Sequence, residues 1–231
     1  MGVLIVTDGI DGCGKSTQVK LLVEDLKKSG IKTTTTKWKD SAYIQDLFIG
    51  DLIERIHGGE AVIPPEARTF LLGADLSYRI ENIIKSKLAD DYVVICDRYA
   101  YKIIAQGIAR GLDKEWLKTV FNFIIEPDLN IIIDIPPELA CERITKYREI
   151  TFYEAGLDIN PSKDRKKAFI EFQKNVRKSI IELVEMKPVI IMDGSKSIKT
   201  QHEGITEFVS DFLIKKGIIN RKIKCIHEAI K

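Results

Sequence analysis

The chain has 231 residues, of which 45% are apolar and 30% charged, and 36 basic residues against 34 acidic ones give a formal net charge of +2. This composition excludes a disordered or low-complexity chain. Because the charges nearly balance, it also argues against a dedicated nucleic-acid binder, whose domain is usually strongly basic. No apolar run approaches the roughly 18 residues that a membrane helix needs, so we expect no membrane association.

The cysteines stand at positions 13, 96, 141 and 225 and form no short pair, so neither a zinc knuckle nor a disulfide framework is indicated. The first residues lack the basic flank of a signal peptide. We therefore expect a cytoplasmic protein with reduced thiols.

Short apolar runs alternate with stretches of helical period, which is typical of an α/β protein with a parallel sheet covered by helices. The predicted strands are Val3–Thr7, Ile31–Lys37, Tyr92–Cys96, Asn130–Asp134 and Val189–Met192. Their β-branched residues, with little polar alternation, predict strands buried on both faces.

Amphipathic helices are predicted after the first strand and near the C-terminus, each ended by a glycine, Gly30 and Gly217. The apolar stripe of the first is Val19, Leu22, Val23 and Leu26, and that of the last is Ile205, Phe208, Val209 and Phe212. Further helices are predicted over Ser41–Arg55, Glu66–Lys87, Tyr99–Ala109, Lys114–Ile124, Pro137–Lys146 and Asp164–Glu185. Because there is no repeat or linker, we expect one domain over residues 1–217 and a basic, peripheral tail over 218–231.

A phosphate-binding loop is predicted between the first strand and the first helix. The run Gly9-Ile10-Asp11-Gly12-Cys13-Gly14-Lys15-Ser16 has the required pattern of glycine, four residues, then glycine-lysine-serine. A polyphosphate needs several N–H donors aimed at one place, and glycine lets the backbone curl that closely. We expect Lys15 to reach the β- and γ-phosphates and the Ser16 hydroxyl to hold Mg²⁺. The predicted nucleotide contacts are Gly9, Ile10, Asp11, Gly12, Cys13, Gly14, Lys15, Ser16 and Thr17; the alternative is a plain strand-to-helix turn.

A second charged group follows the third strand as Asp97-Arg98-Tyr99. This is the carboxyl edge of the sheet, where ligands of open α/β folds collect. Asp97, an acidic residue beside Mg²⁺, and Arg98, a basic residue beside a second phosphate, would then be neighbours. The alternative is a buried Asp–Arg pair that holds two loops together.

These motifs together resemble the thymidylate kinase family of nucleoside monophosphate kinases over roughly residues 1 to 215. The resemblance rests on the loop, on Asp97-Arg98-Tyr99, and on Pro127-Asp128-Leu129 leading to Asp134-Ile135-Pro136-Pro137-Glu138 and Glu142-Arg143. It implies a three-layer P-loop nucleotide kinase fold with a five-stranded parallel sheet in the order 2-3-1-4-5, a lid over about residues 143–163, and usually a homodimer. It also implies Mg²⁺-dependent transfer of the γ-phosphoryl group of ATP to dTMP, giving dTDP.

The resemblance also implies roles for single residues. Asp11 would meet the acceptor sugar, Arg98 would clamp its phosphate, and Asp97 would join Ser16 in holding Mg²⁺. Some members carry an arginine in the loop where this chain has Gly12. A lid residue would then supply the missing cation: Arg148 is the first candidate and Arg143 the next. The alternative is a solvated basic helix end.

The base pocket departs from the family pattern. Leu72 and Leu76 stand where a phenylalanine and an arginine are common, and Arg79, one turn later, could substitute for the arginine. With Arg98 and Asp11, the predicted acceptor contacts are Leu72, Arg79 and Tyr99. A surface ion pair between Asp75 and Arg79 is equally compatible with their spacing.

Selectivity residues differ as well. Lys102 stands where a serine is common in the family, and Ile103 stands at the next position. Gln106 stands where an aromatic residue is common. We therefore predict dTMP as the best acceptor, with appreciable use of dUMP or another deoxynucleotide. The rivals are a kinase of another nucleoside monophosphate and a non-catalytic, nucleotide-gated binding protein. A binding protein needs no second anion clamp, which argues against it.

Overall fold

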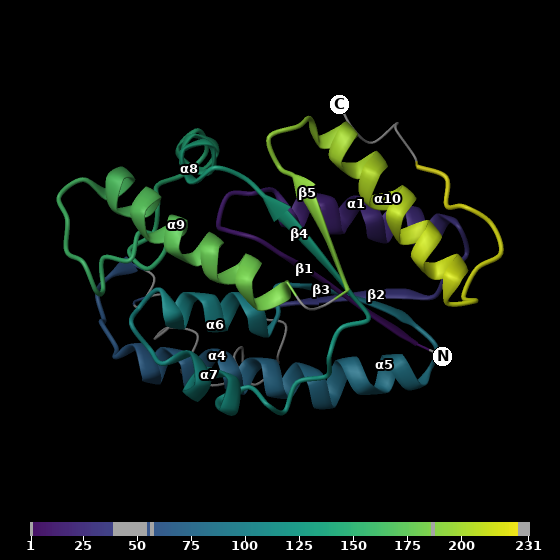
Figure 1. Ribbon diagram of the computed structural model, residues 1–231, viewed down its shortest axis with the longest axis horizontal. Coiled ribbons are helices and arrows are strands. Elements are labelled where there is room, and N and C mark those ends of the chain that lie inside the picture. The colour runs from purple at the N-terminus through teal and green to yellow at the C-terminus, as the bar shows by residue number, and fades with distance from the viewer. Residues whose placement is uncertain (1, 39–54, 56–57, 186–187, 226–231) are drawn as a thin grey trace.

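The computed structural model describes residues 2–38, 55, 58–185 and 188–225 and contains a parallel sheet (Figure 1). Its strands are β1 Val3–Asp8, β2 Thr33–Lys37, β3 Val93–Asp97, β4 Leu129–Asp134 and β5 Val189–Asp193. They lie side by side in the order β2-β3-β1-β4-β5, and every neighbouring pair is parallel. This confirms the predicted α/β class and strand order.

The helices also follow the predicted sequence of elements. They are α1 Lys15–Lys28, α4 Pro65–Arg79, α5 Lys85–Ala89, α6 Ala100–Ile108, α7 Lys114–Val120, α8 Pro137–Thr145, α9 Arg165–Val184 and α10 Ile198–Lys215. A π-helical turn, Ile80–Ile84, joins α4 to α5, so the helix predicted over Glu66–Lys87 has a local interruption. α7 ends at Val120, four residues before the predicted end. The helix predicted over Ser41–Arg55 lies, apart from Arg55, outside the described residues.

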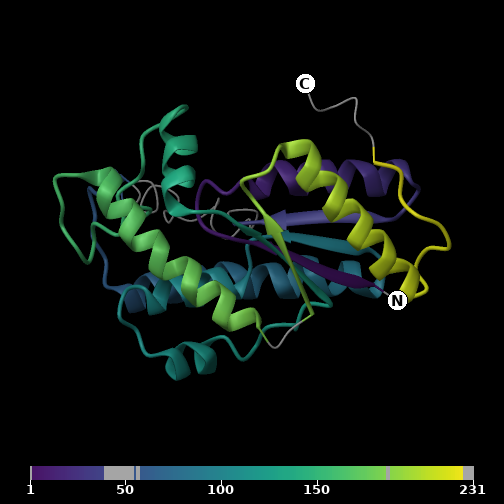
Figure 2. The same cartoon turned by 45° about the horizontal axis from the view of Figure 1, so that its top comes forward.

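The helices form a layer on each face of the sheet (Figures 1 and 2). α1 and α10 pack on one face, where alternate residues of the central strands such as Val3, Ile5 and Val93 join their apolar stripes. The intervening residues, such as Leu4 and Val94, point to the other face and pack with α4, α6 and α7. α8 and α9 enclose a further core beside β4. The period-two alternation of the strands thus builds a three-layer molecule.

The edge strands are less buried than predicted. β1 and β3 are buried along their whole length, as expected. β2 and β5 instead each contain covered and exposed positions, and Ile191 of β5 is 51% exposed. The prediction of burial on both faces is wrong for these strands, because they lie at the edges of the sheet, where the helices cover them only in part.

The described part of the C-terminal tail packs along α10. The Ile223 amide donates to Ser210 Oγ at 3.1 Å, and the Ile223 side chain is buried. Lys222 pairs with Glu207 and Asp211 on the same helix. Within the described ranges, no helix combines the length and apolar character needed to cross a bilayer.

Candidate active site

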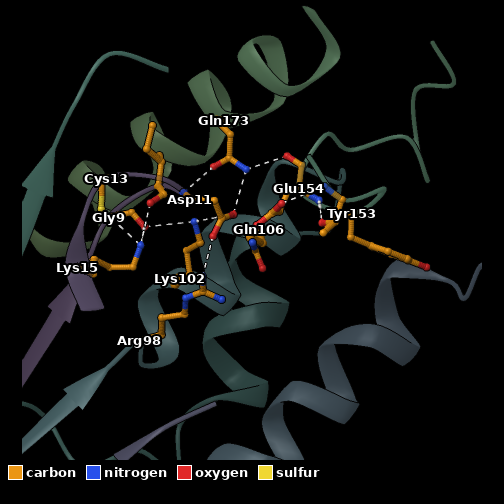
Figure 3. Close-up of polar contacts among 12 residues, drawn as sticks. Gly9, Asp11, Cys13, Lys15, Arg98, Lys102, Gln106, Tyr153, Glu154 and Gln173 are labelled. Atoms are coloured by element: carbon orange, nitrogen blue, oxygen red, sulfur yellow. Dashed lines mark hydrogen bonds and ion pairs between the residues drawn. The ribbon is translucent and has the colours of Figure 1, made fainter. Parts of the chain in front are cut away.

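The predicted loop and the second charged group meet at one edge of the sheet. β1 and β3 are paired neighbours, and their register places Thr7 opposite Asp97. The loop therefore follows β1 directly beside the point where Asp97 and Arg98 follow β3. Figure 3 shows the polar contacts around the loop, with Asp11 at their centre.

The loop holds Lys15 by its own backbone. Lys15 Nζ donates to the carbonyl oxygens of Gly9 at 3.0 Å and Ile10 at 2.8 Å, and lies 3.4 Å from Cys13 Sγ. Lys15 is the first residue of α1, and only 5% of it is exposed. The ammonium group is thus fixed over the loop at a helix N-terminus, the kind of place where proteins bind phosphate.

Gly12 cannot be replaced by a larger residue without a local shift. Its φ of +81° is in the left-handed region, and a Cβ there would lie 2.8 Å from the Ala140 carbonyl oxygen of α8. The missing loop arginine therefore has a packing reason in this chain: α8 lies against the loop at this position.

The oxygen ligands predicted for Mg²⁺ are close together. Ser16 Oγ donates to Asp97 Oδ2 at 2.6 Å. Asp97 Oδ1 and both carboxylate oxygens of Asp8 are buried and have no hydrogen-bond partner within the described residues. Burial raises the pKa of Asp8 to about 7, against the opposing effect of Lys15. Carboxylate and hydroxyl oxygens are the ligands that Mg²⁺ prefers, so this group of side chains fits the ion.

Asp11 is surrounded by cations. Arg98 Nη2 donates to its Oδ1 at 2.9 Å, and Lys102 Nζ lies 3.4 Å from its Oδ2. Gln173 of α9 donates to Oδ2 at 3.1 Å and accepts from the Asp11 amide at 3.3 Å. Burial alone would raise the pKa of Asp11, but Lys102, Arg98 and Lys15 lower it well below its ordinary value. Asp11 is therefore a fixed negative charge that holds the cations in place.

Lys102 is a site residue to which sequence analysis gave no role. It lies on α6, is 2% exposed, and its Nζ donates to the Gly9 carbonyl oxygen at 3.2 Å. Lys15 donates to the same oxygen, so the two ammonium groups converge on the loop. Burial lowers the pKa of Lys102 to about 8, although Asp11 opposes the shift. A lysine within the apolar run of α6 was the signal that could have found it.

Arg98 follows β3 with a strained backbone. Its φ is +75°, in a region that a non-glycine residue adopts at a cost of about 1–3 kcal/mol. Its amide donates to the Thr7 carbonyl oxygen at 3.0 Å, which holds this turn against β1. The conformation leads the guanidinium to Asp11 while 42% of the side chain stays exposed. Such a half-exposed cation can also contact an incoming anion.

The lid candidate Arg148 is paired with an acid. Its guanidinium makes two hydrogen bonds to Glu154, at 2.8 and 2.7 Å. The Glu154 carbonyl oxygen accepts from Gln173, the same side chain that contacts Asp11. The lid is thus joined to the loop through Glu154 and Gln173, neither of which sequence analysis selected. Arg143, the second candidate, lines a cavity beside the loop.

The residues predicted for the base pocket lie in or against the core. Tyr99 is fully buried and its hydroxyl donates to the Ile125 carbonyl oxygen at 3.0 Å. Leu72 is half-buried and packs against the core beneath α4 and α6. Arg79 pairs with Asp75 at 2.8 Å, but both side chains are buried, so the idea of a surface ion pair is wrong. The structure does not bring these residues into the network around Asp11.

A second basic group lies at the far side of that network. Arg68 Nη1 donates to Gln106 Oε1 at 3.2 Å, and its guanidinium lies 5.3 Å from the centre of the Tyr153 ring. Arg110 pairs with Asp158 at 2.7 Å and donates to the Tyr153 carbonyl oxygen at 3.0 Å. Burial and the nearby Arg110 lower the pKa of Arg68 to about 9. No local motif marks these residues, which come from distant parts of the chain.

A cavity of about 850 Å³ opens beside the loop. It is bounded by the loop, the lid and the turn before α10, and its lining includes Gly14, Thr17, Arg143, Tyr147, Arg148 and Ser197. Its volume is in the range of cavities that take a small organic ligand. Asp11, Arg98, Lys102 and Gln173 are not among its lining residues.

Comparison with known proteins gives one consistent result. A family model described as thymidylate kinase matches residues 7–205. A "Probable thymidylate kinase" of Thermococcus gammatolerans is 36% identical over 93% of this chain and 99% of its own length. One of Pyrococcus horikoshii is 35% identical over 92% and 98%. A "Thymidylate kinase" of Geotalea daltonii is 31% identical over 90% and 97%.

Proposed function

Because the chain belongs to the thymidylate kinase family, we propose that it phosphorylates dTMP to dTDP, with ATP as the donor and Mg²⁺ as the metal. The observation that carries this proposal is the convergence of Lys15, Lys102 and Arg98 around Asp11. Phosphoryl transfer needs positioning and charge stabilisation rather than a strong base, because the acceptor phosphate is already largely dianionic at pH 7. Cations fixed between two polyanions meet that need.

The donor phosphates would bind on the loop. Backbone N–H groups of the loop and the α1 N-terminus provide the cradle, with Lys15 as the charge at the transferred group. The adenosine part would occupy the cavity between loop and lid. Ser16, Asp97 and Asp8 would hold Mg²⁺. When bound, the ion neutralises charge on the donor phosphates.

The acceptor phosphate would bind on the opposite side of the loop, at Arg98. That side chain is half-exposed and can contact an anion without losing Asp11 as its partner. Gln106 stands where the family commonly has an aromatic residue, and Arg68 donates to it, so both present polar groups on this side. A site with such polar groups can bond several nucleotides, so we expect dUMP or another deoxynucleotide to be used besides dTMP.

Lys102 would supply the cation that the loop lacks. Gly12 leaves no room for an arginine, and Lys102 brings a charge to the same loop from α6. Arg148 could add a further charge from the lid, provided that it exchanges Glu154 for a phosphate. The charge that a loop arginine supplies in some family members would thus come from two residues here: Lys102, which is fixed, and Arg148, which can exchange its partner.

The test is ADP release from ATP with each common nucleoside monophosphate, with and without Mg²⁺. We expect dTMP to give the highest kcat/KM. A preference for AMP or CMP would overturn the dTMP assignment, and stimulation only by a protein or nucleic acid would favour a binding protein over a kinase.

The proposal includes a homodimer that works in the cytoplasm, where ATP is available. Sedimentation equilibrium of the full chain tests the dimer. No specific nucleic acid partner is part of the proposal, since the formal net charge is only +2.

A further inference from the structure

An imidazole, a carboxylate and a thiol meet away from the phosphate loop. Asp25 lies on α1, His202 on α10, and Cys225 in the segment that follows α10. One ligand atom of each residue lies within 4.8 Å of those of the other two. Asp25 and His202 are buried, at 2% and 0% exposure, and Cys225 is half-buried. The cluster is therefore buried at Asp25 and His202 and lies nearer the surface at Cys225.

The contacts within the cluster are direct. His202 Nε2 lies 2.8 Å from Asp25 Oδ2, and the Thr206 hydroxyl donates to the same oxygen at 3.4 Å. The Cys225 thiol is hydrogen-bonded to Thr206 and Asp25. The other nitrogen of His202, Nδ1, is buried and has no hydrogen-bond partner within the described residues. Nδ1 lies across the ring from Nε2, so Nε2, which faces Asp25, is the atom that would bind a cation shared with Asp25 and Cys225.

We propose that Asp25, His202 and Cys225 form a binding site for a zinc-like divalent cation that fastens the C-terminal tail to α1 and α10. Thiolate, imidazole and carboxylate are the three ligand types that zinc takes in proteins, usually in tetrahedral geometry. Two atoms bound at about 2.0–2.3 Å to such an ion lie roughly 3.3–3.8 Å apart. The three residues need only small side-chain shifts to reach that spacing, and water completes the shell on the exposed side.

The position of the cluster gives the site a structural role. Ile223 and Lys222 already pack along α10, and Cys225 continues this path to α1. Asp25 is ten positions beyond Lys15 on α1, so the cluster is well separated from the loop along the helix. Binding displaces the thiol proton, forms the metal–sulfur bond and joins three segments that are distant in sequence. The ion thus ties down the end of the described chain without contacting the phosphate loop.

The experiment is a titration of the chelator-treated full chain with Co²⁺, which gives a near-ultraviolet charge-transfer band when a thiolate binds it. We expect one equivalent to saturate the band and Zn²⁺ to abolish it by competition. The variant Cys225→Ser should lose the band and bind Zn²⁺ at least about tenfold more weakly. Matched controls are Cys141→Ser on α8 and Cys13→Ser in the loop, both of which should keep the band.

A second variant keeps the test decisive if a buried change unfolds the chain. Cys225→His replaces one ligand type by another at the half-buried position, so it should bind Zn²⁺ without the thiolate band. Zn²⁺ should also raise the melting temperature of the unmodified chain and not that of Cys225→Ser. No saturable band, or an unchanged band in Cys225→Ser, would overturn the proposal. Phosphorylation of dTMP by Cys225→Ser should be unchanged either way, which separates this proposal from the kinase function.

Discussion

The phosphate loop and the lid hold their cations in opposite ways. Lys15 and Lys102 are almost fully buried and donate to backbone oxygens of the loop. Arg148 of the lid is 48% exposed and pairs with the carboxylate of Glu154. An exposed ion pair contributes about 0–1 kcal/mol, whereas breaking a buried one costs about 3–5 kcal/mol. The loop charges are therefore fixed before substrate binds, and the lid charge is free to exchange its partner.

The largest loss of activity is expected when the central positive charge of the loop is removed. Lys15→Met should lower kcat about 10²–10³-fold, because the transferred phosphoryl group loses its fixed cation. Steady-state ADP release measures the loss. The matched control is Lys20→Met, an exposed position on the same helix, which should leave kcat unchanged. A fully active Lys15→Met would mean that the loop does not act on the phosphates.

The second prediction concerns the buried lysine of α6. Lys102→Met should lower kcat about a hundredfold, because Asp11 and the loop lose one of the buried charges that face them. Lys102→Arg should recover part of the rate by keeping the charge. Equal rates for Lys102→Met and the unmodified chain would show that Lys102 only fills space.

The pH dependence of kcat/KM tests independently whether Lys102 must be charged for activity. Its pKa is lowered to about 8 by burial, so the lysine is charged below that pH and neutral above it. Since kcat/KM reports groups of the free enzyme, it should fall as the pH rises above about 8. The fall should be absent in Lys102→Met, whose residual activity no longer depends on this group. A fall of equal size in both proteins would assign it to another group.

A smaller effect is expected in the lid. Arg148→Ala should lower kcat about tenfold and change KM for ATP little, because an exchangeable cation acts mainly in the transition state. Its free energy of unfolding should change by less than about 1 kcal/mol, since the ion pair is half-exposed. Lys163→Ala, also exposed in the lid and outside the cavity lining, is the control. An unchanged rate in Arg148→Ala would rule this arginine out.

The smallest expected change comes from the partner of that arginine. Glu154→Gln removes the charge but can still hydrogen-bond Arg148, so the free energy of unfolding should fall by about 1 kcal/mol or less. Urea denaturation measures the difference. A loss of several kcal/mol would show that the lid pair behaves like the buried loop contacts, and the comparison between the two regions would then fail.

The fold was largely predictable because its signals are local. Apolar runs and helical periods marked the strands and most helices, and the loop motif fixed where β1 gives way to α1. The π-helical turn over Ile80–Ile84 and the exposure of Ile191 were not predictable. Both depend on how neighbouring elements pack, which no local pattern records.

The site was predictable only where it lies within motifs. Lys15, Ser16, Asp97 and Arg98 lie near one another because the strand order brings two strand ends together. Lys102 and Gln173 are separated from their loop partners by 93 and 162 positions, so only the packing of α6 and α9 reveals them. Leu72 and Tyr99 were transferred by resemblance, and Arg79 was offered as a substitute one turn after Leu76; Tyr99 and Arg79 are buried, and Leu72 packs against the core.

The side-chain amide of Gln173 has a mechanical consequence. Its nitrogen is shared between the Asp11 carboxylate and the Glu154 carbonyl oxygen, and its oxygen accepts from the Asp11 amide. A rotation of α9 that lifted the segment around Glu154 would stretch the hydrogen bonds at Asp11 as well. A carboxylate in this place would lose both donations and repel Asp11. Gln173 therefore couples the lid segment at Glu154 to Asp11, so that a displacement of one is transmitted to the other.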